Sequence, residues 1–331
     1  MRIAVTGASG RLGRSVVGVL RAAGHDVRPL DLVLPEGPGA VAVDLVDAEA
    51  ARSVLADLAP DAVVHLAAIA VPFSAPEHRI FTTNTAMAFS VLEAAIAAGA
   101  TRVLVASSPT VLGYGGADWV PERLPLDEDV PVAPAHAYAL SKVCVEEMVA
   151  MFARSTPGAR FASFRPCFVI APEEWAGAVT QQGHSVLDRL RDPALAAVSL
   201  FNYVDARDAG EFVAHWLDAD AAPSGVCYFV GAQDALATRP LAELLPEHLP
   251  GTAAAAAGLV DTRPAFDSSA ARRDTGWTAR RSWRTELDAD ALAALAALRP
   301  TPPLPTQPPP TSPLDHVASA SGPALSRRTP S

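Results

Sequence analysis

Short apolar runs alternate with helical patterns through the first half of the chain. The apolar runs are rich in β-branched residues and have the length of buried parallel strands. They cover residues 2–7, 26–32, 40–45, 61–68 and 102–108. Between them, segments 11–24, 48–59 and 84–99 repeat apolar residues three and four positions apart, as helices with one buried face do. This strand–helix order predicts an α/β fold with a doubly wound parallel sheet and right-handed crossovers.

The second half of the chain is less regular. Residues 159–170 and 225–231 have the pattern of further strands, whereas 171–200 mixes Pro, Gln, Gly and Trp without a strong period. From Arg299 onward the chain is rich in Pro, Ser and Thr and has too little apolar surface to bury. We therefore predict one folded domain over 1–298 and a Pro-rich disordered tail over 299–331.

Composition narrows the class of protein. The 331 residues are half apolar and carry a net charge of −10, which argues against nucleic acid or an anionic membrane surface as a partner. No apolar run is long enough to predict a transmembrane helix, and the first residues lead into a strand rather than a signal sequence. Three widely spaced cysteines and eight histidines without ligand-like spacing predict a cytoplasmic protein and no metal site.

Three glycines, Gly7, Gly10 and Gly13, lie between the first predicted strand and the first predicted helix. In a Rossmann fold, glycines so placed allow a tight turn, close approach of a pyrophosphate and close packing of the helix, whose N-terminus faces the phosphates. Asp31 ends the second predicted strand, where a carboxylate would bind the adenosine ribose. No Arg or Lys follows it directly, which favours NAD over NADP. The alternatives are a glycine loop without a ligand and a solvated turn aspartate.

Tyr138 and Lys142 lie one turn apart on a helix predicted to start near Ala137. We expect the pair to lie off the apolar stripe of this helix, which consists of Leu140, Val143, Cys144, Met148, Met151 and Phe152. A phenol titrates near pH 10, so acting as a base at neutral pH requires its pKa to fall by about 3 units. A nearby ammonium and a nicotinamide positive charge would lower the pKa of Tyr138 in that direction. The alternative is a solvated helix face.

The spacing T-G-x-x-G-x-x-G, led by Thr6, resembles that of short-chain dehydrogenases/reductases. Further motifs resemble the extended branch of that group, the NAD-dependent epimerase/dehydratase family, and the likeness runs from Met1 to about Arg284. The motifs are Val43–Leu45, His65–Ala68, Phe164–Pro166, Asn202–Gly210 and Ser269–Trp277. The resemblance implies a cofactor part mainly over 1–165 and a small C-terminal α/β substrate-binding portion mainly over 166–200 and 225–298.

The resemblance also implies an enzyme with a catalytic set of Ser108, Tyr138 and Lys142, Ser107 being the less favoured register of the serine. Tyr138 would be the general acid or base, Lys142 would also hold the nicotinamide ribose, and Ser108 would bind the substrate oxygen. Asn84 would open a helix near the ribose. The implied cofactor-binding residues are Gly7, Ser9, Gly10, Arg11, Leu12, Gly13, Asp31, Asp44, Leu45, Leu66, Ala67, Ala68, Asn84, Tyr138, Lys142 and Pro166.

Family positions also imply a substrate pocket. Its residues would be Ile69, Val71, Ser108, Thr110, Tyr114, Phe168 and Trp175. Pro109-Thr110 stands where sugar dehydratases of the family carry an Asp-Glu pair, so dehydratase chemistry is not expected. The short segment 167–201 indicates a small substrate, or one that is bound with fewer phosphate contacts. Glu173 and Glu174 within this segment disfavour an anionic substrate. The alternative is that both glutamates simply face water.

Three functions stay open on this resemblance. The first is an NAD-dependent oxidoreductase that transfers a hydride at a secondary alcohol or ketone of a sugar-like or small polar substrate. The second is a sugar or nucleotide-sugar epimerase, an isomerase that keeps its NAD bound. The third is a non-catalytic nucleotide sensor, against which the complete Ser–Tyr–Lys set argues. Family members often pair through two long helices, here the helix over 84–98 and the helix of Tyr138, so a homodimer is expected.

Overall fold

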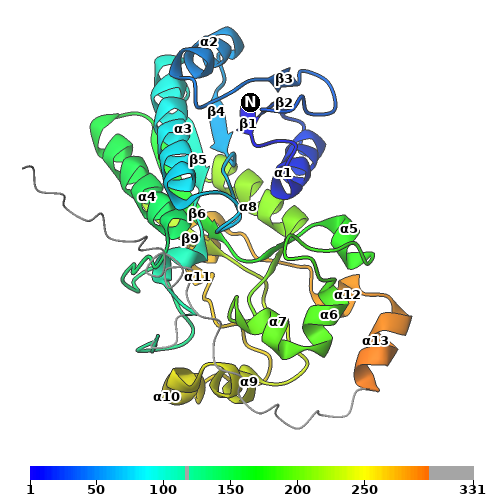
Figure 1. Cartoon of the computed structure of the whole chain (residues 1–331). Coiled ribbons are helices and arrows are strands. Elements are labelled where there is room, and N and C mark those ends of the chain that lie inside the picture. The colour runs from blue at the N-terminus through cyan, green and yellow to red at the C-terminus, as the bar shows by residue number, and fades with distance from the viewer. Residues whose placement is uncertain (116–118, 298–331) are drawn as a thin grey trace, which may run out of the picture. The chain divides into compact units, whose positions relative to one another are not determined.

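Figure 1 shows a central sheet flanked by helices. The computed structural model describes residues 1–115 and 119–297, so the predicted tail over 299–331 lies outside the described residues. The parallel strands of the sheet are β1 (Arg2–Thr6), β2 (Asp26–Asp31), β3 (Val41–Ala42), β4 (Ala62–His65), β5 (Arg102–Ala106), β6 (Arg160–Pro166) and β9 (Val226–Val230). Their order is β3-β2-β1-β4-β5-β6-β9, so the direction of winding reverses between β1 and β4. This topology confirms the predicted doubly wound α/β fold.

The sheet is buried on both faces, which explains the continuous apolar runs of its strands. From Ile3 to Thr6 and from Ala62 to Val64, every residue is fully buried. Strands covered by helices on both sides have no solvated face, so they show no alternation of apolar and polar residues. Each of the five predicted runs in the first half contains a strand, but the run over 40–45 contributes only Val41–Ala42.

Five helices cover the sheet in two layers (Figure 1). They are α1 (Arg11–Ala22), α2 (Ala48–Leu58), α3 (Glu77–Ala97), α4 (Ala137–Ser155) and α8 (Ala206–Asp218). Helices α1 and α8 pack together on one face, and α3 packs between α2 and α4 on the other. Successive residues of β1 point to the two layers in turn. Ile3 and Val5 belong to the core under α1 and α8, and Ala4 belongs to the core under α2, α3 and α4.

Helix α3 starts two turns earlier than predicted, at Glu77 rather than Asn84. Its first turn exposes polar side chains and buries only Ile80, so the apolar pattern is too sparse there to be recognised. Asn84 therefore lies inside the helix and does not open it.

Among the described residues, α3 is also the one helix long and apolar enough to cross a membrane. It is packed as the middle helix of its layer, and its buried positions include Met87, Val91 and Leu92. These contacts are those of a core helix.

Helix α4 begins at the predicted residue but turns a different face to the sheet. Its buried residues are Tyr138, Ala139, Ser141, Lys142, Val145 and Val149. Two residues of the predicted apolar stripe, Leu140 and Met151, are 44% and 39% exposed. The expected orientation is therefore wrong: the Tyr–Lys pair lies on the buried face, because apolar residues occupy two sides of this helix.

Short elements build a smaller portion after β6. They are β7 (Val169–Ile170), α5 (Pro172–Trp175), α6 (Val186–Arg191), α7 (Pro193–Ala197), β8 (Val204–Asp205), α9 (Leu241–His248), α10 (Ala253–Ala256), α11 (Ser269–Thr275), α12 (Trp283–Glu286) and α13 (Ala289–Ala296). The strand predicted over 159–170 is two strands, because the chain leaves the main sheet after Pro166 and β7 pairs with β8 in a second sheet. A separate apolar core around Phe168, Trp175, Tyr203 and Trp283 joins β7, α5, α6, α12 and α13. The buried residues of α7, α9, α10 and α11 belong instead to the core under α1 and α8.

Candidate active site

A cavity of about 800 Å³ opens at the carboxyl ends of the central strands. Doubly wound sheets bind ligands at this edge, next to the point where the winding reverses, and the volume is within the range of small-molecule sites. Every residue predicted to bind the cofactor lines the cavity, except Asn84. Of the predicted substrate residues, Ile69, Ser108, Thr110, Tyr114 and Phe168 line it.

The glycine turn between β1 and α1 has no room for a Cβ at two of its positions. At Gly7, where φ is +68°, a Cβ would lie 2.6 Å from the backbone nitrogen of Ala67. At Gly13 a Cβ would lie 2.1 Å from the carbonyl oxygen of Gly7. Gly10 is less constrained, since its Cβ would meet only that same oxygen, at 3.1 Å. Gly10 precedes α1 without a side-chain cap, so the N–H groups of the first helical turn are left for a ligand in the cavity.

Asp31 ends β2 and ties it to the glycine turn. One carboxylate oxygen accepts a hydrogen bond from the backbone of Ser9 at 2.8 Å, and the other accepts one from Leu32 at 2.7 Å. Each oxygen can accept a second hydrogen bond. Leu32 and Val33 line the same end of the cavity and are 68% and 69% exposed. The Asp31 carboxylate can accept hydrogen bonds from a ribose diol, and Leu32 and Val33 can contact an aromatic base attached to that ribose. The same carboxylate repels a phosphate.

A buried pair, Thr6 and His65, holds the loop that follows β4. The Thr6 hydroxyl lies 2.7 Å from His65 Nδ1 and accepts hydrogen bonds from the backbones of Leu66 and Ala67 at 3.1 and 3.3 Å. Because two N–H groups already donate to this oxygen, its own proton is free for a neutral imidazole. Burial, and secondarily the charge of Lys142, lowers the pKa of His65 to about 3. The sequence motif alone gave no indication of this pairing, which joins two strands.

Asn84 supports the cavity from behind and does not line it. Its side-chain oxygen accepts a hydrogen bond from Ile69 N at 2.8 Å, and its amide nitrogen donates to Ile69 O and to Ser141 Oγ, both at 3.2 Å. Asn84 is 2% exposed and is not among the residues that line the cavity, unlike the other predicted cofactor residues. It fixes the loop at Ile69 against α4 instead.

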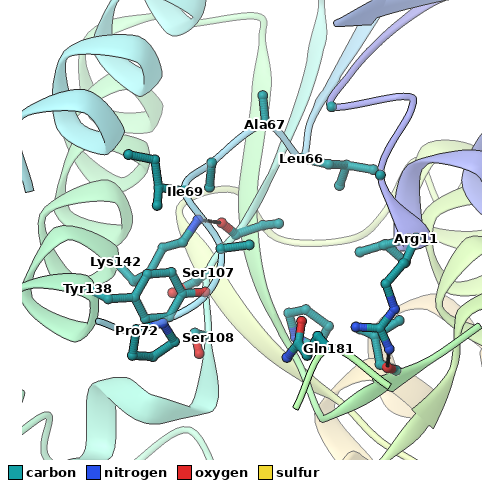
Figure 2. Close-up of a pocket in the computed structure, with 18 of the residues that line it drawn as sticks. Arg11, Leu66, Ala67, Ile69, Pro72, Ser107, Ser108, Tyr138, Lys142 and Gln181 are labelled. Atoms are coloured by element: carbon teal, nitrogen blue, oxygen red, sulfur yellow. Dashed lines mark hydrogen bonds between the residues drawn. The ribbon is translucent and has the colours of Figure 1, made fainter. Parts of the chain in front are cut away.

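Tyr138 and Lys142 lie together on α4, with Ser108 near the tyrosine ring (Figure 2). The Lys142 ammonium donates a hydrogen bond to the carbonyl oxygen of Ala106, at the end of β5, at 2.8 Å. It lies 5.8 Å from the centre of the Tyr138 ring. Both side chains are almost fully buried but reach the cavity, so the predicted one-turn spacing places them at the same wall.

The charge state of this pair differs from the expected one. Burial raises the pKa of Tyr138 to about 12, while a hydrogen bond with Ser108 acts in the opposite direction. Burial also lowers the pKa of Lys142 to about 8, which the charge of Glu146 opposes. Among the protein's own groups, the desolvation of a phenolate is therefore the dominant effect, and the predicted lowering of the pKa would need the nicotinamide positive charge as well as Lys142. At neutral pH the protein holds a neutral phenol beside a cationic lysine.

Two adjacent serines follow β5 and bind different partners. Ser107 donates to Glu146 Oε1 at 2.5 Å, and the same carboxylate binds two nitrogens of Arg165 at 2.8 Å. The Ser108 hydroxyl lies 2.9 Å from the Thr110 hydroxyl, on the side of Tyr138 (Figure 2). Ser107 is thus engaged in a buried ion-pair cluster, and this favours Ser108 as the serine that meets a substrate.

Two predicted substrate residues do not line the cavity. Trp175 is buried and donates from its indole nitrogen to Asp205 Oδ2 at 2.7 Å. Its segment forms α5, which packs the indole edge-on against Tyr203 in the core of the smaller portion. Val71 lies in the loop after β4, where its neighbours line the cavity instead. The structure therefore does not place these two residues among those that line the cavity.

Other cavity residues had no local signal in the sequence. Among them are Phe73, His136, Gln181, Gln182 and Ser199. His136 caps α4 by accepting a hydrogen bond from Ala139 N at 3.2 Å, and its ring stacks with that of Tyr138. Burial lowers the pKa of His136, which suits this acceptor role. The position of a histidine just before a predicted helix could have indicated the cap, whereas the glutamines reach the cavity only through tertiary packing.

Glu173 and Glu174 face the glycine-turn helix rather than a substrate. Glu174 is 3% exposed and pairs with Arg11 at 2.5 Å, and Glu173 pairs with Arg14 on the surface. Neither glutamate lines the cavity. The expectation that they disfavour an anionic substrate therefore has no structural support, because arginines neutralise both charges.

Comparison with known proteins agrees with this geometry. The sequence model of the NAD dependent epimerase/dehydratase family matches residues 3–231. The chain is 32% identical over 157 residues to a UDP-glucose 4-epimerase of Azospirillum brasilense. It is 37% identical over 154 residues to an L-arabinose 1-dehydrogenase (NAD(P)(+)) of Haloferax volcanii. These matches take in 45% and 44% of this chain and 43% and 59% of the relatives, so the chain spans about half the length of the curated relatives it matches.

The structural likeness is more extensive. A short-chain dehydrogenase/reductase superfamily protein from Agrobacterium tumefaciens, crystallised with bound NAD, superposes with a TM-score of 0.64 at 26% identity. The superposition covers 89% of this chain and 97% of that protein. The smaller portion therefore also has a counterpart in that structure.

Proposed function

Because the chain belongs to the NAD-dependent epimerase/dehydratase family, we propose that it is an NAD-dependent oxidoreductase that transfers a hydride at a secondary alcohol or ketone of a sugar-like substrate. One observation carries the proposal. Ser108, Tyr138 and Lys142 line the same cavity as the glycine turn and Asp31, although they come from distant parts of the chain. A nucleotide sensor would need the glycine turn but not the other three side chains.

The cavity fits a dinucleotide. Gly7 lies too close to the loop after β4, and Gly13 too close to the turn, for either to carry a side chain. The first turn of α1 can receive a pyrophosphate. Asp31 offers acceptors to the adenosine ribose, and Leu32 and Val33 offer apolar contacts to the base. A carboxylate at this place repels a 2′-phosphate, which favours NAD over NADP. The NAD in the Agrobacterium structure and the NAD(P) specificity named for the Haloferax relative support a nicotinamide cofactor here.

Each residue of the Ser–Tyr–Lys set has its own role in the reaction. NAD, when bound, supplies the hydride acceptor or donor and, when oxidised, a positive charge near the reacting carbon. Ser108 binds the substrate oxygen, and Tyr138 gives a proton to it or takes one from it. Because the pKa of Tyr138 is raised to about 12, the phenol is ready to act as an acid at neutral pH. To act as a base it needs both cations nearby, and Lys142 supplies one of them.

The alternative is an epimerase that keeps its NAD, and the match to the Azospirillum UDP-glucose 4-epimerase favours it. The two functions differ in net redox change. We expect purified protein supplied with NAD⁺ and a panel of sugars and sugar derivatives to accumulate NADH, seen as near-ultraviolet absorbance. An isomerised product without NADH would support the epimerase, and neither product with any compound would contradict both.

We also propose that two copies pair through α3 and α4. Phe89 on α3 and Leu140 and Met151 on α4 are 42%, 44% and 39% exposed, so both helices carry apolar side chains that the single chain does not bury. Light scattering on a sizing column should give the mass of a dimer. Leu140→Glu should shift the mass to that of one chain, and a monomeric wild type would refute the pairing.

A further inference from the structure

His136 is the N-cap of α4 and also lines the cavity. Its backbone is extended, with a φ of −154°, and its Nδ1 accepts a hydrogen bond from Ala139 N at 3.2 Å. Ser, Thr, Asp and Asn are the residues that usually occupy such a position, because a short side chain with an oxygen is enough to cap a helix. Capping alone therefore does not account for an imidazole at this place.

The cap determines the tautomer of this imidazole. An Nδ1 that accepts a hydrogen bond carries no proton, so the proton of the neutral ring lies on Nε2. Burial lowers the pKa of His136, although the charge of Glu77 opposes this effect, so the ring is neutral at neutral pH. Across residues 1–115 and 119–297, no group accepts a hydrogen bond from Nε2, and this nitrogen is not buried. His136 therefore has an N–H donor left for a ligand.

Two aromatic rings contact the imidazole. The ring of His136 is nearly parallel to that of Tyr138, at 14° and with 6.1 Å between the ring centres. It is tilted by 56° against the ring of Phe73, at 5.3 Å. Phe73 has a φ of +61°, a left-handed conformation that is strained for a bulky residue and that is found chiefly at functional sites. All three rings line the cavity, so the orientation of the imidazole is fixed before a ligand binds.

These rings lie at the reacting end of the cavity. Figure 2 shows Pro72, the residue before Phe73, on the side of Tyr138 and Ser108, whereas Arg11 lies on the other side. Under the proposed function, Tyr138 and Ser108 bind the reacting oxygen of the substrate. A donor on the neighbouring imidazole can therefore reach another oxygen of the same small molecule, close to the reacting carbon.

We propose that His136 is a substrate-binding residue whose Nε2–H donates a hydrogen bond to a second substrate oxygen, on the carbon next to the reacting carbon. The inference rests on the proposed function, since it assigns a further residue and a required substrate group to that same site. Sugars and other polyols carry such a hydroxyl, whereas their deoxy analogues leave the donor unpaired. A site that hydrogen-bonds a substrate hydroxyl rejects the analogue without it. His136 thus selects vicinal diols over simple secondary alcohols.

Two substitutions separate the cap from the donor. The side-chain oxygen of Asn can take the place of Nδ1, and Asn is a favoured N-cap, so His136→Asn keeps the cap and removes the donor. Gln is one carbon longer and its amide nitrogen can take the place of Nε2, so His136→Gln keeps a donor and loses the cap. If His136 only caps α4, His136→Asn should change neither stability nor activity. If His136 binds substrate, His136→Asn should change substrate selection at an unchanged Tm.

The experiment uses the full chain with NAD⁺ and matched pairs of probes. The pairs are trans-1,2-cyclohexanediol with cyclohexanol, D-glucose with 2-deoxy-D-glucose, and D-galactose with 2-deoxy-D-galactose. Calorimetry measures binding to the NAD complex, and kcat/KM is measured wherever turnover occurs. We expect the wild type to prefer the hydroxylated member of at least one pair by about tenfold, the contribution of one hydrogen bond. His136→Asn should lose this preference with a Tm within about 1 °C of wild type, whereas His136→Gln should keep part of the preference and lower the Tm by about 2 °C.

Three results would overturn the inference: no preference within any pair in the wild type, an unchanged preference in His136→Asn, or an equal loss for both members of every pair with a lower Tm. Failure of the proposed function looks different. No NADH would form with any probe, while calorimetry would still report whether His136→Asn loses the preference for the hydroxylated probes. Conversely, turnover without selection between the paired probes would keep the oxidoreductase and remove the role of His136.

Nitrogen NMR of histidine-labelled protein at neutral pH gives a readout that does not depend on turnover. The signals of His136 are those absent from the spectrum of His136→Asn. We expect them to show the proton on Nε2, and a proton on Nδ1 would contradict the proposed donor.

Discussion

The two ends of the cavity are built in different ways. The cofactor end, around the glycine turn and Asp31, consists of β1, the turn and α1 together with the ends of neighbouring strands. Backbone atoms determine its shape, because they approach Gly7 and Gly13 too closely for a side chain. The substrate end is assembled from side chains of separate loops and short helices, and its character depends on which charges are paired. Glu174 is paired with Arg11, whereas the partners of the buried Arg189 within the described part of the chain are the neutral side chains of Gln182 and Ser199.

This difference explains what the sequence could predict. Where the backbone allows only one residue type, that residue recurs at a fixed spacing that can be recognised in the sequence. The glycine turn, Asp31 and the Tyr–Lys pair were therefore predicted without the structure. Side-chain contacts between distant segments follow no fixed spacing in the sequence. The contact of Trp175 with Asp205 and that of Ser107 with Glu146 could therefore not be predicted. The sequence also predicted the wrong buried face for α4. Apolar residues lie on two faces of this helix, so their spacing does not show which face packs against the sheet. The raised pKa of Tyr138 could not be predicted either, because it comes from burial, which the sequence does not give.

The two serines after β5 allow the first test of this difference, because the largest change in kcat/KM is expected there. Ser108→Ala should lower kcat/KM by about 100- to 1,000-fold, because it removes a hydrogen bond to the reacting oxygen. Ser107→Ala should retain most of kcat and instead lower the Tm, since its hydroxyl serves the Glu146 cluster. Steady-state kinetics and thermal unfolding of both variants check this. A reversed pattern would assign the catalytic role to Ser107.

At the cofactor end, Gly13→Ala should destabilise the protein by about 3 kcal/mol, because its Cβ cannot avoid the Gly7 carbonyl oxygen. Gly10→Ala is the matched control. Its Cβ meets that oxygen at 3.1 Å, so stability should change by less than about 1 kcal/mol while NAD affinity falls. Urea unfolding and NAD titration measure the two effects. Equal destabilisation by both variants would show that the turn is not shaped as described.

The buried pair of Thr6 and His65 predicts an acid-sensitive cofactor end. The unfolded chain binds a proton on His65 near pH 6.5, whereas the folded protein, with a pKa of about 3, does not. Stability from this group is therefore complete above pH 6.5 and is lost as the pH falls toward 3, by about 2 kcal/mol at pH 5. Unfolding curves of wild type and His65→Gln should converge between these pH values. Parallel curves would contradict a buried neutral imidazole.

The smallest effects concern the ion pairs that join α5 to α1. Glu174→Gln should cost about 1 kcal/mol, because Arg11 then faces a buried neutral amide. Glu173→Gln should change stability by less than about 0.5 kcal/mol, because the pair with Arg14 is exposed. Thermal unfolding at low and high salt checks both values. An equal loss in the two variants would mean that burial does not distinguish these pairs.

The most direct test of the account is Tyr138→Phe, measured for NAD binding and for turnover on the same preparation. The phenol is assigned to proton transfer and the glycine turn to cofactor binding. The variant should therefore bind NAD within about twofold of wild type and lose about 1,000-fold or more in kcat. A variant that keeps a tenth or more of wild-type turnover, or that loses NAD binding in proportion to activity, would contradict the account.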